Sequence, residues 1–270
     1  MFKKNFMLLI NFLIFLTFAY LVLVLIIFLL QRKLMYHPDE NNHLEENLLN
    51  HEISKVYINS DQKILGWYHF KNDINKTLLF FHGNAGNLQN RIYKLNDLSK
   101  LNLNYLIIAY RGYSGNDGNP SEHGLYKDSQ SAKLWLNKKG VDDSDIILYG
   151  ESLGTAVAVD LASKHSFAGI ILESPFTSML ELSKIYYPYL PVNLLLKDRY
   201  ESINKIKKIN FPKMVMHGQK DKIVPFEMGK KIFDNFSDPK LSYFKSNDDH
   251  MMNFDEDLLN NIKNFLKIVN

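Results

Sequence analysis

The sequence predicts an α/β protein in which one mostly parallel sheet of about eight strands carries helices on both faces, behind a single membrane-spanning helix. Three observations predict it. The first 35 residues hold a long uncharged apolar stretch. Short apolar runs then alternate with helix-patterned stretches, as in parallel strands joined by crossover helices. No repeat or low-complexity linker divides the later residues, so we expect an anchor at 1–35 and one domain at 36–270.

Residues 6–30 are predicted to form an uncleaved membrane anchor. These 25 residues carry no charge, and only Asn11 and Thr17 are clearly polar. About 20 apolar residues span a bilayer core, and a buried core helix rarely stays apolar on every face for this length. A cleaved signal peptide would have a shorter apolar region of roughly 7–15 residues, followed by small residues. Here the segment continues into LLQRKLMYHP instead.

The basic excess of the chain belongs to the two ends of that segment. The formal net charge is +3, yet four of the 32 basic residues and none of the 29 acidic ones lie within residues 1–35. No basic run interleaved with aromatic residues follows, which disfavours nucleic-acid binding. Lys3, Lys4 and the terminal amine before the segment, against Arg32 and Lys33 after it, favour by a narrow margin an N-terminus inside. The folded domain would then lie on the non-cytoplasmic side.

Strand-like and helix-like elements alternate after residue 50. Most of the strand-like runs are continuous in Ile, Leu and Val, as in strands covered on both faces. The predicted strands, of which the first two are expected to pair antiparallel, are 53–59, 64–70, 77–81, 104–110, 145–150, 168–174, 213–218 and 240–245. Helices are expected near 88–101, 121–139, 153–165, 226–236 and 254–268.

The clearest functional signal is GESLG at residues 150–154, which fits the pattern G-x-S-x-G. It lies between a predicted strand and a predicted helix, the context of a nucleophile elbow. Glycines on either side allow strand and helix to approach closely, and the helix N-terminus favours negative charge beside Ser152. The chain has no cysteine, so Ser152 is the predicted nucleophile; the alternative is a Gly-Ser turn without chemistry. For Glu151, a carboxylate that tunes the turn and a solvent-facing one both stay open.

His250 is the predicted general base among nine histidines. A serine hydroxyl needs a base that an acid orients, and the expected chain order is Ser, then Asp or Glu, then His. Four histidines precede the central strands, and two lie on helix surfaces. His82 and His217 stand in His-Gly turns, where we expect structural hydrogen bonds. His250 remains, in a polar loop between the last strand and the last helix; the alternative is a solvated loop histidine.

Asp221 is the predicted acid. It follows the strand-like run 213–218 closely, where a carboxylate can hold the imidazole Nδ1–H and so fix its tautomer. Other carboxylates near these elements are alternatives: Glu173, Asp198, Asp248 and Asp249. We expect the last two, as sequence neighbours of His250, to point to solvent.

The backbone N–H groups of Leu153 and Asn84 are predicted to form the oxyanion hole. One such donor follows the nucleophile, and a second comes from the loop after the third strand. That loop reads HGNAGN at residues 82–87, and its two glycines allow a ligand to approach the backbone. A plain strand-to-helix turn is the alternative.

These motifs together resemble the α/β-hydrolase family, and more narrowly its membrane-anchored Bem-type and ABHD-type branch. The resemblance covers residues 34–268 and includes the stretches at 110–128, 173–178 and 188–212. It implies a serine hydrolase without metal or organic cofactor. The residues it implies for the site are Ser152 as nucleophile, Asp221 as acid, His250 as base, and Asn84 and Leu153 as oxyanion donors.

The sequence therefore predicts a membrane-anchored serine hydrolase that acts on acyl esters or thioesters through an acyl-serine. Residues 179–212 are expected to form a small cap rich in Tyr and Leu. That composition suits a lid over an acyl chain and equally the simple packing of a cap helix. With the anchor, it favours a small acyl or lipid substrate. A peptidase of the serine aminopeptidase type and a non-catalytic interaction module of the same fold remain alternatives.

Overall fold

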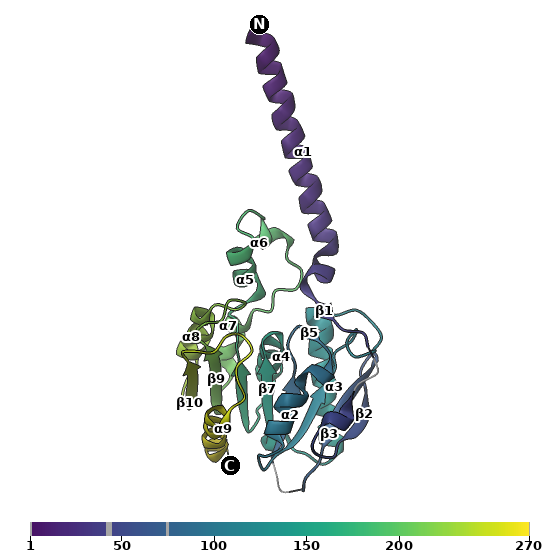
Figure 1. Ribbon diagram of the computed structural model, residues 1–270, viewed down its shortest axis with the longest axis vertical. Helices are drawn as coiled ribbons and strands as arrows, with labels where there is room; N and C mark the ends of the chain where they lie inside the picture. The colour runs from purple at the N-terminus through teal and green to yellow at the C-terminus, as the bar shows by residue number, and fades with distance from the viewer. Residues whose placement is uncertain (1, 42–44, 74–75, 270) are drawn as a thin grey trace.

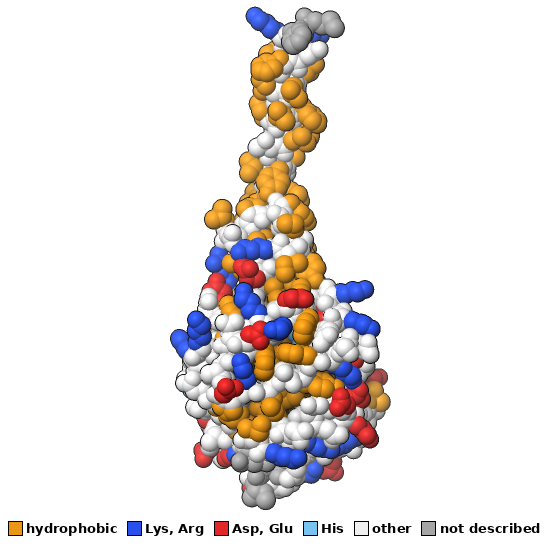
Figure 2. All heavy atoms as spheres, turned by 90° about the vertical axis from the view of Figure 1, so that its left-hand side faces the viewer, with side chains coloured by type: hydrophobic (Ala, Val, Ile, Leu, Met, Phe, Trp, Pro, Cys, Tyr) orange, Lys and Arg blue, Asp and Glu red, His pale blue; other side chains and the backbone are white. Residues whose placement is uncertain are grey.

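The computed structural model describes residues 2–41, 45–73 and 76–269 and has two parts. A long helix, α1 (Phe2–Met35), extends away from a layered α/β body (Figure 1). None of its most apolar stretch is buried, and its length and composition are sufficient to cross a membrane. Apolar side chains follow the helix, whereas charged side chains are scattered over the body below it (Figure 2). The predicted N-terminal apolar helix is confirmed.

The body is built on one eight-stranded sheet with the strand order β10-β9-β8-β7-β4-β6-β3-β2. The six strands from β10 to β6 are parallel, and the last two pairings, β6 with β3 and β3 with β2, are antiparallel. The predicted fold class and the antiparallel first pair are therefore confirmed. The strands are β2 (Ser54–Asn59), β3 (Lys63–His69), β4 (Thr77–Phe81), β6 (Asn104–Ile108), β7 (Ile146–Glu151), β8 (Gly169–Glu173), β9 (Lys213–Gly218) and β10 (Lys240–Lys245).

Helices cover both faces of this sheet (Figure 1). Every residue of the central strands β4, β7 and β8 is therefore buried. All five predicted helices are present. The first begins as a 3₁₀ turn, so its α-helical part is shorter than predicted. The helices are α2 (Ile92–Leu98), α3 (Glu122–Lys138), α4 (Leu153–Ala162), α8 (Phe226–Asn235) and α9 (Glu256–Val269).

Two smaller features lie between α1 and the loops of the sheet. A two-residue strand, β1 (His37–Pro38), pairs in parallel with β5 (Ala85–Gly86), directly after the predicted oxyanion loop residue Asn84. Between β8 and β9 the chain forms the short helices α5 (Met179–Tyr186), α6 (Val192–Leu195) and α7 (Ser202–Lys205). The loops after the parallel strands meet at the carboxyl edge of the sheet, where ligands bind in open α/β sheets. The candidate site lies at this edge, below α5 and α6.

Candidate active site

Ser152 occupies a strained turn between β7 and α4. Its φ is +51° and its ψ −115°, a conformation that costs a residue with a side chain about 1–3 kcal/mol. A Cβ on Gly154 would lie 2.0 Å from the Phe81 carbonyl oxygen, and one on Gly150 would lie 2.5 Å from the Thr155 Cα. The close approach of strand and helix expected from the two glycines is therefore present, and it holds the serine at the start of α4.

The three residues of the predicted triad lie within hydrogen-bond distance of one another. His250 Nε2 is 3.0 Å from the Ser152 Oγ, and His250 Nδ1 is 2.7 Å from one carboxylate oxygen of Asp221. The other oxygen of Asp221 accepts the backbone N–H groups of Ile223 and Val224, each at 2.8 Å. When Nδ1–H donates to the ionised carboxylate, the proton stays on Nδ1, and the unprotonated Nε2 can accept the serine proton. This is the geometry that the sequence order predicted.

A second histidine supports the Asp221 carboxylate. His217 Nε2 lies 3.1 Å from the oxygen that also faces His250. Burial alone would raise the pKa of Asp221, but hydrogen bonds with His217 and His250 outweigh it and hold that pKa well below its usual range. Asp221 is therefore ionised at neutral pH. A structural hydrogen bond is predicted for His217 from the sequence, and His217 makes one with the Val224 carbonyl at 3.0 Å. The contact between His217 and Asp221 was not predicted.

His82, in the other His-Gly turn, is also structural. It is fully buried, and its Nδ1 lies 2.7 Å from the Gly83 carbonyl oxygen. Burial and the nearby Arg91 charge lower its pKa to about 3, so it is neutral at physiological pH. The structural role predicted for it agrees with these contacts.

The alternative acids are engaged elsewhere, and one of them corrects the sequence analysis. Asp249 is exposed, as expected, but Asp248 is only 3% exposed. Its carboxylate accepts the backbone N–H of Asn253 at 2.9 Å and the side-chain amide of the same residue at 3.1 Å. The expectation that Asp248 points to solvent is wrong, because the loop folds back and uses this side chain to satisfy its own backbone. Asp248 thus shapes the loop that carries His250.

The two predicted oxyanion donors flank the serine. Leu153 is the first residue of α4, and the first N–H groups of a helix have no partner within it. Asn84 lines the same cavity as Ser152 and Leu153. Its carbonyl accepts the Tyr113 hydroxyl at 2.7 Å, and its side-chain amide donates to the Met35 carbonyl. These two bonds fix the backbone carbonyl and the side chain of Asn84.

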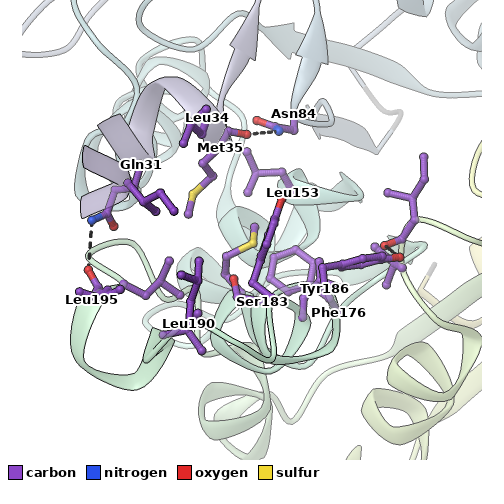
Figure 3. A pocket seen from close by; sticks show the side chains of 18 of the residues that line it. Gln31, Leu34, Met35, Asn84, Leu153, Phe176, Ser183, Tyr186, Leu190 and Leu195 are labelled. Atoms are coloured by element: carbon purple, nitrogen blue, oxygen red, sulfur yellow. Dashed lines mark hydrogen bonds between the residues drawn. The ribbon is translucent and has the colours of Figure 1, made fainter. Parts of the chain in front are cut away.

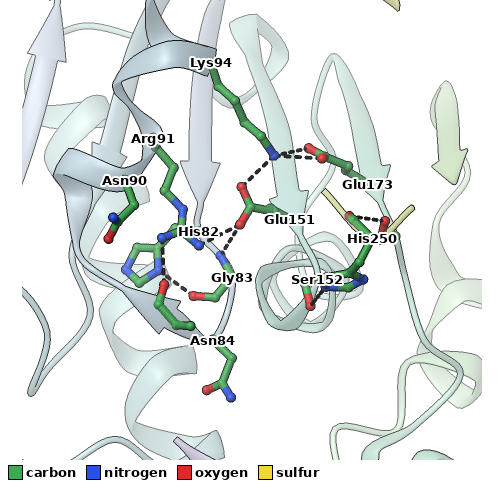
Figure 4. A network of polar contacts seen from close by, with 12 residues as sticks. His82, Gly83, Asn84, Asn90, Arg91, Lys94, Glu151, Ser152, Glu173 and His250 are labelled. Atoms are coloured by element: carbon green, nitrogen blue, oxygen red, sulfur yellow. Dashed lines mark hydrogen bonds and ion pairs between the residues drawn. The ribbon is translucent and has the colours of Figure 1, made fainter. Parts of the chain in front are cut away.

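A buried cluster of four charged side chains stands behind the serine (Figure 4). Lys94 Nζ lies 2.7 Å from both Glu151 and Glu173, and Arg91 Nη2 lies 2.7 Å from Glu151. Each of the four is at most 4% exposed. The solvent-facing interpretation of Glu151 is therefore wrong.

The two glutamates of the cluster differ in their protonation. Burial would raise the pKa of Glu151, but the charges of Arg91 and Lys94 outweigh it and lower that pKa. The pKa of Glu173 is raised, by burial first and by the charge of Glu151, with Lys94 opposing. Of the two carboxyl groups, Glu173 therefore takes up a proton more readily than Glu151.

The cluster connects three loops of the site. Glu151 directly precedes the nucleophile, and its carboxylate also accepts the Gly83 backbone N–H at 3.2 Å, one residue before Asn84. Glu173 directly precedes Ser174, whose Oγ donates to the His250 carbonyl at 3.1 Å. The predicted nucleophile, oxyanion donor and base are thus each connected to the same buried charges, either as a neighbour in sequence or through a hydrogen bond.

A cavity of about 670 Å³ opens beside Ser152 and reaches under the predicted cap (Figure 3). Its lining is mostly apolar and includes Phe176 and, from the cap, Leu190 and Leu195. Tyr186 of α5 closes one side by donating to the Lys222 and Ile223 carbonyls at 2.6 and 3.0 Å. The last turns of α1 supply a further wall, which the sequence did not predict.

Comparisons with known proteins agree with this fold. The strand order, the strained serine turn and the loops at the carboxyl edge define the α/β-hydrolase class. The sequence model of the family described as "alpha/beta hydrolase fold" matches residues 76–200. An uncharacterized protein of Mycobacterium tuberculosis is 40% identical over 178 residues, which cover 65% of this chain and 63% of that protein. The chain therefore has the α/β-hydrolase fold, and part of its sequence is similar to members of that family.

Two further proteins are similar to this chain, one in sequence and one in fold. The human alpha/beta hydrolase domain-containing protein 17B is 35% identical over 165 residues, which cover 60% of this chain and 56% of that protein. The esterase Pf2001 of Pyrococcus furiosus has a solved structure that matches with a TM-score of 0.68 at 17% identity, covering 86% of this chain and 98% of the esterase. The sequence matches thus span about 60% of the length of these curated relatives, and the esterase is similar in fold.

We expect Glu151→Gln to destabilise the protein more than Glu173→Gln. A neutral amide at position 151 leaves Arg91 and Lys94 without their shared carboxylate, and breaking a buried ion pair costs about 3–5 kcal/mol. The cost at position 173 is smaller, because its raised pKa means that the charged form of Glu173 is less strongly stabilised than that of Glu151. Melting temperatures of the two isosteric variants and the wild type in one detergent test this. Equal losses, or a larger loss for Glu173→Gln, would contradict it.

Proposed function

We propose that this chain is a membrane-anchored serine hydrolase that cleaves acyl esters or thioesters through an acyl-serine intermediate. The observation that carries the proposal is the unbroken chain of contacts from the Ser152 Oγ to His250 at 3.0 Å and from His250 to Asp221 at 2.7 Å. A nucleophile, a base and an orienting acid in this order are the requirement for serine catalysis.

In the proposed reaction His250 Nε2 takes the Ser152 proton as Oγ attacks the acyl carbonyl carbon. The backbone N–H groups of Leu153 and Asn84 receive the charge that develops on the carbonyl oxygen. Asp221 stabilises the imidazolium, which then gives its proton to the departing alcohol or thiol. Water, deprotonated by the same imidazole, releases the acid and restores the serine.

The composition of the cavity favours an acyl chain over a peptide. Of its described lining residues only Lys222 is charged, and none carries a carboxylate that would pair with the free ammonium group of a peptide. A peptide would also bring backbone N–H and C=O groups into an apolar lining, at a cost of about 1–3 kcal/mol for each unpaired group. Hydrocarbon carries no such cost.

We further propose that α1 anchors the protein with its N-terminus inside and the catalytic body on the non-cytoplasmic side. The 25 uncharged residues at 6–30 exceed the about 20 that span a bilayer core. Basic residues lie at both ends of this segment, so the proposed orientation rests on a small difference in positive charge between the two ends.

Ser152→Ala is expected to abolish labelling by a fluorophosphonate probe, because the probe reacts with an activated serine. Asp221→Asn should lower ester hydrolysis by about 10⁴-fold, since the imidazole loses the group that fixes its tautomer. Asp249→Asn is a matched control beside His250 and should retain activity within about twofold, because its side chain is exposed. Labelling of the Ser152→Ala variant, or equal losses for the two aspartates, would refute the assignment.

A series of nitrophenyl esters compared with aminoacyl anilides tests the substrate class. We expect kcat/KM to rise with acyl length, by up to about fourfold per methylene, because each buried methylene contributes about 0.8 kcal/mol. The Ser152→Ala variant supplies the background rate. Faster cleavage of the anilides would reverse the proposed order of substrates.

The absence of cysteine allows a direct test of orientation. We expect Lys138→Cys, on the body, to react with an impermeant maleimide on intact cells. Asn5→Cys, before the apolar segment, should react only after the membrane is opened. The reverse pattern would overturn the orientation and leave the anchoring untouched.

A further inference from the structure

One face of the last turns of α1 forms a wall of the cavity at Ser152. The residues that line it are Ile27, Gln31, Leu34 and Met35, spaced by four, three and one along the helix. Residues three or four apart lie on the same helix face. Figure 3 shows Leu34 and Met35 on one side of the cavity and Leu190 of the cap on the other. The space next to the predicted nucleophile is therefore enclosed between α1 and the cap.

Polar contacts fix this wall in place. The Gln31 side chain donates to the Leu195 carbonyl at 3.0 Å and accepts the Lys197 N–H at 2.8 Å. Arg32 binds Asp198 with two hydrogen bonds of 2.8 and 3.0 Å, and Asp198 is only 3% exposed. Two neighbouring residues of α1, Gln31 and Arg32, are thus hydrogen-bonded to the segment 195–198, and these bonds position α1 against the cap.

The cap extends along the apolar part of the helix. The Tyr20 hydroxyl donates to the Tyr189 carbonyl at 2.8 Å. Tyr20 precedes Leu30 by ten residues, which is about 15 Å of helix at about 1.5 Å per residue. Any window of about 20 residues taken from 6–30 to span the bilayer core contains Tyr20, at least about 8 Å from its C-terminal end. The tip of the cap therefore reaches into the membrane when α1 spans it.

The side chains at this tip suit a membrane. Tyr187 and Tyr189 are about half exposed or more, and Leu194 is 85% exposed. Tyrosines gather at the boundary between hydrocarbon and water, where the ring is apolar and the hydroxyl is hydrated. Figure 1 shows α5 and α6 beside the lower end of α1, on the side of the body from which the helix emerges. The cavity that Ser152 lines thus faces the lipid leaflet.

We propose that the fatty acyl chain of a membrane lipid ester enters the cavity directly from this leaflet, between α1 and the cap, and that Ile27 of the anchor limits its length. The inference rests on the proposed function. The lipid acyl carbonyl reaches Ser152, its chain lies along the α1 wall, and the lipid alcohol leaves with the proton from His250. Water then completes the hydrolysis and releases the fatty acid. The anchor is in this account a part of the substrate site.

Fluorophosphonates with ethyl and dodecyl chains, added to the full-length protein in phosphatidylcholine vesicles, test this. Ile27→Trp should lower the ratio of dodecyl to ethyl labelling rates by at least about tenfold, the effect of removing two or more methylenes from the cavity. Ile26→Trp is the matched control. It has the same depth and residue type, but its side chain is exposed and outside the lining, so the ratio should change less than about twofold. Ile27→Ala should shift the preference to a longer chain.

Retained ethyl labelling shows that a variant is folded and that Ser152 is activated. If both tryptophan variants change the ratio equally, or neither does, the inference is overturned while the proposed function stands. If the wild type is labelled by neither probe, the proposed function fails, and the inference fails with it.

Discussion

Four buried side chains of opposite charge connect the parts of the site to the sheet. Glu151 and Glu173 end the adjacent parallel strands β7 and β8, and they are direct partners in the strand register. Two carboxyl groups this close would repel one another, and Lys94 between them offsets the repulsion, with Arg91 as a second cation. The cluster directly precedes the serine turn and accepts a hydrogen bond from the loop before Asn84. Through Ser174 it is also connected to the loop that carries His250. Ser152, in its strained conformation, directly follows Glu151, and its backbone N–H donates to the Glu173 carbonyl at 2.9 Å.

The fold and the turn around Ser152 were accessible from the sequence because their signals are local. Continuous apolar runs separated by helix patterns indicate buried parallel strands, and the turn around Ser152 carries its own glycines. The contacts of Glu151 were not accessible, because they depend on the register of β7 with β8 and on which face of α2 meets the sheet. Asp248 was misjudged for a similar reason, since its burial follows from the path of the loop. A side chain's sequence neighbours do not reveal that path.

The link between anchor and site was also beyond the sequence. Arg32 and Asp198 are 166 residues apart in the chain, and no periodicity connects them. Once paired, they place the end of an apolar helix beside the predicted nucleophile and against the cap. Arg32, which the sequence identifies only as a basic residue at the end of the apolar segment, thus also holds a wall of the cavity in place. In the proposed function the same helix provides both attachment and a surface for substrate.

The central claim is that an acyl group passes through a covalent bond to Ser152. Intact-mass and peptide mass spectrometry after brief mixing with a nitrophenyl decanoate measures this bond directly. The account predicts an increase by one decanoyl group, located on the peptide that contains Ser152 and absent in Ser152→Ala. Turnover of the ester with no adduct, or an adduct located on another residue, would contradict it.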